Sequence, residues 1–189
     1  IPDIPVYLDS PMSINATEIY NTFFDEHRLS KKEANGIFSS AIYVNDAEES
    51  KMLDRNDVPS IIISASGMLT GGRVLFHIRR YAQQAQNSIV FTGYQAGGTR
   101  GDRILNKEDE VKIHGEMVPI RCNVEILHNM SAHADYSEML EYLENIEKTP
   151  KKVFITHGEL DASESLKEKI EEKFGWDCII PDYKDSFNL

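Results

Sequence analysis

The sequence has 189 residues, of which 41% are hydrophobic and 27% charged, which is ordinary for a globular protein that buries its own core. No apolar run approaches the ~20 residues of a membrane-spanning helix, and the first residues lack the basic and apolar regions of a signal peptide. The two cysteines, Cys122 and Cys178, show no CxxC spacing, which argues against a disulfide framework and favours reduced thiols in a cytoplasmic protein.

The formal net charge of −11 is unevenly distributed along the chain. Between residues 71 and 103 there are five arginines and one acid, Asp102, so this zone carries +4 and the rest of the chain −15. The arginines are Arg73, Arg79, Arg80, Arg100 and Arg103. Exposed charges more than ~10 Å apart are mostly screened at ordinary salt, so such a basic zone can bind a polyanion on an acidic protein. The alternative is a solvated arginine face on one helix.

The amino-terminal half alternates between strand-like and helix-like segments. Strands are predicted at VYLD (6–9), AIYV (41–44), SIIISAS (60–66) and SIVFTG (88–93). Helices are predicted to open at Pro11 and Ser13, to run from a cap at Asn45 or Asp46 to about Asp54, and to span Val74 to Ala82. The last two strands are apolar runs typical of strands buried on both faces. Because the first segment is already a strand, we expect a piece cut from a longer chain.

The carboxyl-terminal half has a different sequence pattern, which begins with the glycine-rich loop YQAGGTRG. A β-hairpin with its turn at His114-Gly115-Glu116 and a further strand are predicted within 110–127. Helices are predicted from a capping box of Asp135 with Glu138 and from a cap at Asp161 or Ser163, and strands at VFIT (153–156) and DCII (177–180). This alternation predicts an α/β fold with a mostly parallel sheet.

The first candidate binding loop is SASGMLTGGR, which follows a predicted buried strand. In open α/β sheets, ligands bind at the carboxyl ends of strands. The hydroxyls of Ser64 and Ser66, the small Gly67 and the free amides of the helix start near Arg73 suit a phosphate group. The alternative is a tight strand-to-helix turn that needs small residues only for packing.

Two further loops each present a histidine. His133, in SAHAD, has small neighbours such as Ser131 and precedes a helix N-terminus, where the helix dipole disfavours a charged imidazole unless an anion lies nearby. His157, in THGE, is expected to project from a strand end as a metal ligand, with Glu159 supporting it. Zinc sites need three or more protein ligands, so one histidine is not a site. The remaining histidines are interpreted as structural or exposed: His27, His77, His114 and His128.

Taken together, these loops resemble the metallo-β-lactamase-fold ribonucleases that carry a β-CASP insertion, a family that includes ribonuclease J and the endonuclease of the pre-mRNA cleavage machinery. The resemblance spans nearly the whole sequence. Its motifs, in order, are PVYLDSPM, IIISASGMLTGGR, GYQAGGTRGDRIL, VKIHGEMVPIRCNVEIL, SAHADYSEML and VFITHGE. One departure is Asp102, which stands where the family commonly has an arginine and puts one backbone contact in doubt.

The resemblance implies hydrolysis of RNA phosphodiesters with two zinc ions, held mainly by an upstream H-x-H-x-D-H motif that this sequence lacks. His133 would match the histidine that acts as general acid, with Ser131 leaving room for the phosphate, and His157 would match a zinc ligand. Arg100 and Arg103 would contact RNA, with the other basic residues, in a cleft. Zinc is not expected to be retained by this chain alone.

The resemblance also implies a fold and partners. Residues 1–95 would be the carboxyl-terminal part of a β-CASP α/β domain, and residues 96–189 the returning carboxyl-terminal part of a metallo-β-lactamase αββα fold. The partners would be RNA, the absent amino-terminal part of the same chain and, as a further candidate, a second copy in a homodimer. The alternatives are a non-catalytic β-CASP subunit that acts as an RNA-binding scaffold and, less supported by motifs, a nucleotide-binding α/β domain.

Overall fold

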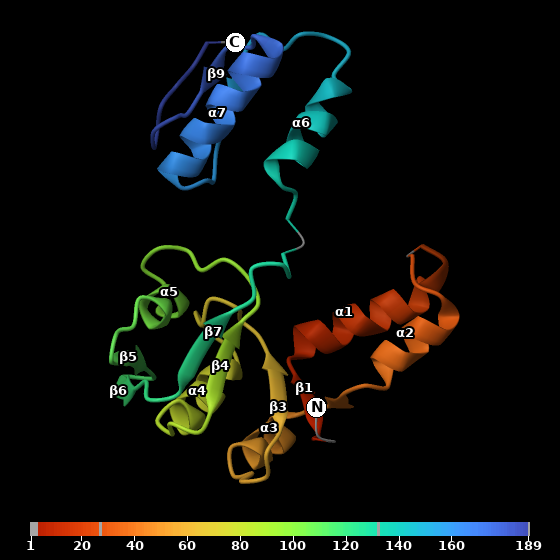
Figure 1. Cartoon of the computed structure of the whole chain (residues 1–189), viewed down its shortest axis with the longest axis vertical. Helices are drawn as coiled ribbons and strands as arrows, with labels where there is room; N and C mark the ends of the chain where they lie inside the picture. Colours follow the sequence, from red (N-terminus) through yellow and green to blue (C-terminus); the bar gives the residue numbers. More distant parts are fainter. Residues whose placement is uncertain (1–3, 27, 132, 189) are drawn as a thin grey trace. The chain divides into compact units, whose positions relative to one another are not determined.

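The computed structural model describes residues 4–26, 28–131 and 133–188 and divides the chain into two compact units, Ile1–Ser131 and Ala132–Leu189 (Figure 1). Strand pairing is parallel except in one hairpin, which confirms the predicted α/β fold. Within the described ranges, no helix is both long and apolar enough to cross a membrane. The unit boundary reflects contacts within the fold, so the domain boundary expected after residue 95 stays a prediction.

The first sheet is a parallel arrangement of β1 (Val6–Asp9), β2 (Ile42–Tyr43) and β3 (Ile61–Ser64) in the order β2-β1-β3. The helices around it are α1 (Pro11–Thr22), the 3-10 turn η1 (Phe24–Glu26), α2 (Lys31–Phe38) and α3 (Ala47–Leu53). Of the two predicted caps, Asn45 and Asp46, it is Asp46 that caps α3, by accepting hydrogen bonds from the Glu48 and Glu49 amides. α2 was not predicted from the sequence, although it begins at a capping box of Ser30 and Glu33.

The prediction that the third and fourth strands are buried on both faces is wrong for this chain. Ile61 and Ile63 are 42% and 49% exposed, and Val90 of β4 (Ser88–Phe91) is 50% exposed. The side chains of a strand alternate between its two faces, and α3 and α4 contact the face of the first sheet that holds Asp9. Ile61 and Ile63 point to the opposite face, where Leu8 of β1 is buried but the β3 side chains stay exposed.

The predicted hairpin is confirmed as β5 (Glu110–Ile113) and β6 (Glu116–Pro119), which pair antiparallel. Its turn residues, His114 and Gly115, have φ values of 49° and 88°, the positive values that a type I′ turn requires at both positions. The strand that follows, β7 (Asn123–Ile126), pairs parallel with β4.

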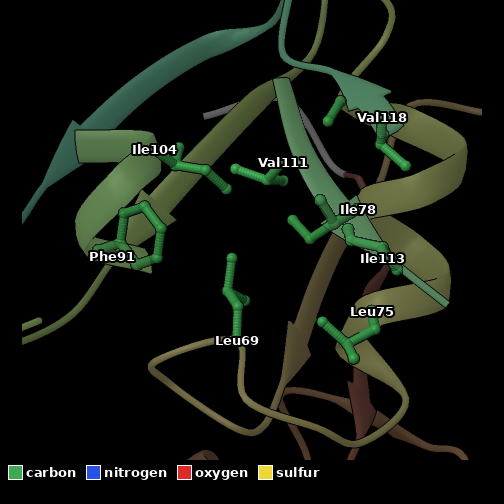
Figure 2. Close-up of a cluster of buried hydrophobic side chains, with 9 residues drawn as sticks. Leu69, Leu75, Ile78, Phe91, Ile104, Val111, Ile113 and Val118 are labelled. Carbon is green, nitrogen blue, oxygen red and sulfur yellow. The ribbon is translucent and has the colours of Figure 1, made fainter. Parts of the chain in front are cut away.

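The core of the first unit forms where α4 (Val74–Tyr81) and α5 (Arg100–Leu105) meet β4 and the hairpin. Figure 2 shows these side chains converging from elements that are far apart in the sequence. The buried residues are Leu69, Leu75, Ile78, Ala82, Phe91, Ile104, Val111, Ile113 and Val118.

The second unit consists of α6 (Tyr136–Glu144), β8 (Val153–Phe154), α7 (Leu160–Phe174) and β9 (Cys178–Ile179). β8 and β9 pair parallel, and the core contains Leu140, Ile155, Ile170, Trp176 and Cys178. The predicted capping box of Asp135 and Glu138 is confirmed at the start of α6. The predicted cap of the next helix is wrong: α7 has its N-cap at Glu159, so Ser163 falls inside the first helical turns, where it is buried.

Candidate functional site

The loop between β3 and α4 is folded by its own hydroxyl groups. The Ser64 hydroxyl donates to the Asp9 carbonyl oxygen at 2.7 Å, and Ser66 Oγ accepts from the Thr70 amide at 3.1 Å. Ser66 Oγ also lies 3.0 Å from Thr70 Oγ1. Gly67 is exposed, with nothing within 4 Å of the place where a Cβ would stand. The serines considered for phosphate binding therefore also shape the loop that would bind it.

An open hollow of about 310 Å³ lies between this loop and the loop that follows β4. Its lining residues are Ser66, Gly67, Met68, Thr70, Thr92, Gly93, Tyr94 and Gln95. The loops that follow β3 and β4, strands of two different sheets, thus line one concave surface at the carboxyl ends of these strands. Tyr94 is 62% exposed, and an exposed aromatic ring beside hydroxyl groups suits a nucleotide, because bases stack on such rings.

Arg73 ties three segments of the first unit together. Its Nη1 atom donates to Asp9 Oδ1 at 2.7 Å and to the Val44 carbonyl at 3.0 Å, and Nη2 donates to the Asn45 carbonyl at 3.4 Å. Contact with an RNA phosphate would compete with these bonds. The assignment of Arg73 to RNA binding stays a prediction.

Asp9, which was not among the predicted site residues, lies at the centre of a buried polar network. Its carboxylate is fully buried and accepts a hydrogen bond from Ser50 Oγ at 2.6 Å. His77 lies between two carboxylates, with Nε2 2.7 Å from Asp9 and Nδ1 2.7 Å from Asp54. The sequence signal was an acid at the end of an apolar strand, which needs partners when buried.

The network sets the protonation of both groups. Burial by itself would raise the pKa of the Asp9 carboxyl, but hydrogen bonds from Ser50, Arg73 and His77 outweigh it and hold that pKa below its ordinary value. Burial would likewise lower the pKa of His77, whereas its hydrogen bonds to Asp54 and Asp9 raise that pKa above its ordinary value. His77 is therefore a structural histidine.

The glycine-rich loop is held by Asp102 and Arg100. Asp102 Oδ2 accepts from the Gly98 amide at 2.9 Å, and its Oδ1 accepts from Asn106 Nδ2 at 2.9 Å. An arginine at this position could not accept these bonds, so the departure from the family pattern has a structural role here. Arg100 Nε donates to the Lys112 carbonyl at 2.6 Å, and Nη1 donates to the Leu69 carbonyl at 2.9 Å.

Most charge of the basic zone is balanced locally. Each of four arginines forms an ion pair with a carboxylate: Arg73 with Asp9, Arg79 with Glu116, Arg80 with Asp57, and Arg103 with Glu108 at 2.6 Å. In the part of the chain that the structure describes, the hydrogen bonds found for Arg100 all reach neutral carbonyl oxygens. Arg100 therefore keeps the least neutralised charge of the five.

The two histidines of the family motifs both belong to the second unit and are exposed. His133 directly precedes the N-terminal segment of α6, whereas Ser131 is the last residue of the first unit. His157 does not project from the strand end as expected, because β8 ends at Phe154. It lies in the turn before α7 with a φ of 66°. Of the other histidines, His114 and His128 are exposed, and His27 lies outside the described residues.

The described residues do not fit a zinc centre by themselves. No group of three or more His, Cys, Asp or Glu side chains comes together among them as a metal site. Zinc needs at least three protein ligands, and His157 would supply one.

Two family descriptions match this chain. "Beta-Casp domain" matches residues 1–104, and "Zn-dependent metallo-hydrolase RNA specificity domain" matches residues 117–181.

Curated relatives agree with these matches. "Ribonuclease TTHA0252" of Thermus thermophilus is 34% identical over 84% of this chain and 37% of its own length. "Transcription termination factor FttA" of Methanosarcina mazei is 31% identical over 92% of this chain and 29% of its own. The same factor of Pyrococcus abyssi is 32% identical over 99% of this chain and 31% of its own. The chain therefore spans about a third of the length of these relatives and belongs, as its motifs predict, to the β-CASP family of metallo-β-lactamase-fold proteins.

Proposed function

We propose that this chain forms the RNA-binding and proton-donating part of a zinc-dependent ribonuclease that hydrolyses RNA phosphodiesters in RNA processing or decay. The observation that carries the proposal is that the two family segments occur in order and the second contains both His133 and His157. The name of the Thermus thermophilus relative supports a ribonuclease, and the description of the second segment supports RNA as the partner.

His133 is the proposed general acid. Its imidazole is exposed beside the small Ala134, immediately before Asp135 caps α6. When water attacks the phosphorus, the bond to the 3′-oxygen breaks, and His133 would donate a proton to that oxygen. Imidazole is the side chain suited to proton transfer near neutral pH, and such acid catalysis contributes ~10²–10⁴-fold.

His157 is the proposed contribution of this chain to zinc binding. Bound zinc would supply an activated water and stabilise negative charge on the phosphate. The remaining ligands are proposed to come from the part of the chain that precedes this sequence, and the described residues provide no cluster that fits zinc. Zinc retention by this chain alone is not expected.

RNA is proposed to contact the hollow after β3 and β4. Ser66, Gly67 and Tyr94 line it, and Arg100 donates to the carbonyl of Leu69 in the loop that forms its wall. The polar loop would face phosphates, and the Tyr94 ring would stack on a base. Roles for Ser64, Arg73, Arg103 and Ser131 in binding RNA, like a homodimer and a cytoplasmic location, stay predictions.

A non-catalytic scaffold subunit is the second candidate. The relatives named as transcription termination factors are compatible with a role other than RNA turnover. A scaffold has no need of an acid or a metal ligand, whereas this chain carries a histidine at both motif positions. That difference favours catalysis.

The test compares His133→Ala and His157→Ala in the whole nuclease. His133→Ala should lower turnover ~10²–10⁴-fold with zinc content unchanged, because it removes the acid only. His157→Ala should lower both turnover and zinc content, because it removes a metal ligand. A substrate with a 3′-bridging sulfur should rescue His133→Ala selectively, because a thiolate leaves without a proton.

The matched control is His128→Ala, an exposed histidine of the first unit, which should behave as the unaltered protein. Equal zinc loss in both motif variants, or rescue of neither, would assign His133 a different role. Absence of turnover in the unaltered whole protein would favour the scaffold, whereas full activity of both variants would assign the acid and metal-ligand roles to other residues.

A further inference from the structure

The turn between β8 and α7 holds His157 in a backbone conformation that ordinary side chains rarely adopt. Its φ of 66° is in the left-handed region, where glycine is the usual residue. A non-glycine residue stays in that region only when its surroundings force it, and such residues cluster at functional sites. Something next to His157 therefore has to hold the turn.

The neighbouring Gly158 shows what holds it. Gly158 is not among the glycines with positive φ, so its own backbone does not require glycine. A Cβ added at Gly158 would instead stand 2.5 Å from Ser163 Oγ, which is too close for real atoms, and 3.8 Å from Ser163 Cβ, which is ordinary contact. An alanine at 158 would therefore require the buried Ser163 hydroxyl or the turn itself to move.

Ser163 is held firmly on α7 and lies next to this turn. It is 3% exposed, and its amide donates to the Glu159 carbonyl at 2.9 Å, across the start of the 15-residue helix. Farther along α7, Ile170 is anchored in the core of the second unit. On the other side of the turn, the Ile155 amide donates to the Ile179 carbonyl at 2.9 Å. Both ends of the turn are therefore fixed.

We propose that Ser163 is a positioning residue for His157, acting through contact of its buried hydroxyl with Gly158. The inference rests on the proposed function in so far as His157 is taken as a metal ligand. The Ser163 side chain holds the turn in the conformation that directs the imidazole.

The experiment is a compensation cycle of Gly158→Ala, Ser163→Ala and the double variant. Gly158→Ala should change the amide–Hα coupling constant of His157, measured by NMR on this chain, because the turn has to move. In the whole nuclease it should reduce zinc content and lower turnover ~10²-fold, the effect of a misplacement of about 1 Å. The double variant should restore the coupling constant, the zinc content and the turnover. Without the hydroxyl of residue 163, the Cβ added at position 158 meets only the Cβ of residue 163, at 3.8 Å.

The control is Gly175→Ala at the carboxyl end of α7, where φ is 66° and nothing lies within 4 Å of the added Cβ. It should weaken the second unit without changing the His157 coupling. Trp176 is the only tryptophan, so its fluorescence reports folding of this unit in each variant. If Gly158→Ala unfolds the unit, recovery of native fluorescence in the double variant supports the contact.

An unchanged His157 coupling in a folded Gly158→Ala variant, or a double variant no better than that single variant, would overturn the proposal. Failure of the proposed function looks different. In that case, the coupling follows the cycle as expected, whereas His157→Ala leaves zinc content and turnover intact.

Discussion

At the scale of single residues, the fully buried Asp9 connects several elements of the first unit. It binds Ser50 of α3, Arg73 before α4 and His77 of α4, so one carboxylate joins β1 to two helices. A buried charge of this kind is stable only while its partners stay in place. Asp54 on the far side of His77 adds a second carboxylate, so a protonated His77 bridges two negative charges.

The first prediction concerns how the stability of the first unit depends on pH. The pKa of His77 is raised in the folded state, so its contribution to stability is complete below the unfolded value of ~6.5 and is lost as pH rises through the folded pKa. The pKa of Asp9 is lowered, so its contribution is present above ~3.9 and is lost as pH falls through the folded pKa. Hydrogen exchange of first-unit amides should show the greatest protection between these limits.

Two histidine variants separate the contribution of His77 from the other pH effects on stability. His77→Gln should destabilise the first unit by about 3 kcal/mol near pH 6, because it leaves two carboxylates without the bridging charge, and should remove the loss of protection above pH 6.5. His128→Gln, at an exposed position, should leave the stability of the first unit and its pH dependence unchanged. Equal pH dependence in His77→Gln and the unaltered chain would contradict the bridging role.

At the scale of elements, the connection between β3 and α4 explains why small residues occur there. Gly72 has a φ of 84°, and a Cβ on it would stand 2.5 Å from the Ala65 carbonyl oxygen. The packing alternative raised for this loop therefore describes Gly72 correctly. The same loop also lines the hollow through Ser66 and Gly67, so the two interpretations of this loop are compatible.

The second prediction follows from two adjacent glycines. Gly72→Ala should lower the free energy of unfolding of the first unit by at least ~2 kcal/mol, because left-handed strain alone costs ~1–2 kcal/mol and the clash adds to it. Gly71→Ala meets nothing within 4 Å and should stay within ~0.5 kcal/mol. Hydrogen exchange of β3 and α4 measures both, and similar effects at the two positions would refute the assignment.

At the scale of the whole molecule, the proposed binding of RNA to this acidic chain would depend on a small and mostly paired basic zone. Four of its five arginines face carboxylates, so little of the local +4 charge is free to meet a polyanion. Arg100 is the exception within the described residues, because its hydrogen bonds reach carbonyl oxygens only. We expect Arg100 to dominate the electrostatic part of RNA binding.

The third prediction tests this expectation with single-stranded RNA. The logarithm of the RNA affinity falls linearly with the logarithm of the salt concentration. Arg100→Gln should make this slope shallower by ~0.7, the value for one lost phosphate contact. Arg79→Gln, which removes an arginine already paired with Glu116, should leave the slope unchanged. Equal slopes for Arg100→Gln and the unaltered chain would exclude a phosphate contact by Arg100.

By itself, the sequence determined the features that depend on neighbours along the chain. Local backbone chemistry predicted the cap at Asp135, the turn at His114 and Gly115 and the strand VYLD, and it narrowed the cap of α3 to Asn45 or Asp46. The order of the motifs likewise predicted the family, because motif order is a property of the sequence.

Only the tertiary structure decided which side chains meet across long separations. Asp9 and His77 are 68 positions apart, and no local pattern shows that a strand-end acid will find that histidine. The exposure of Ile61 and Ile63 was mispredicted for the same reason: an apolar run shows that a strand could be buried, whereas burial requires another element on that face. The position of Ser163 beside Gly158 likewise depends on where α7 begins, and no side-chain hydrogen bond caps that helix start.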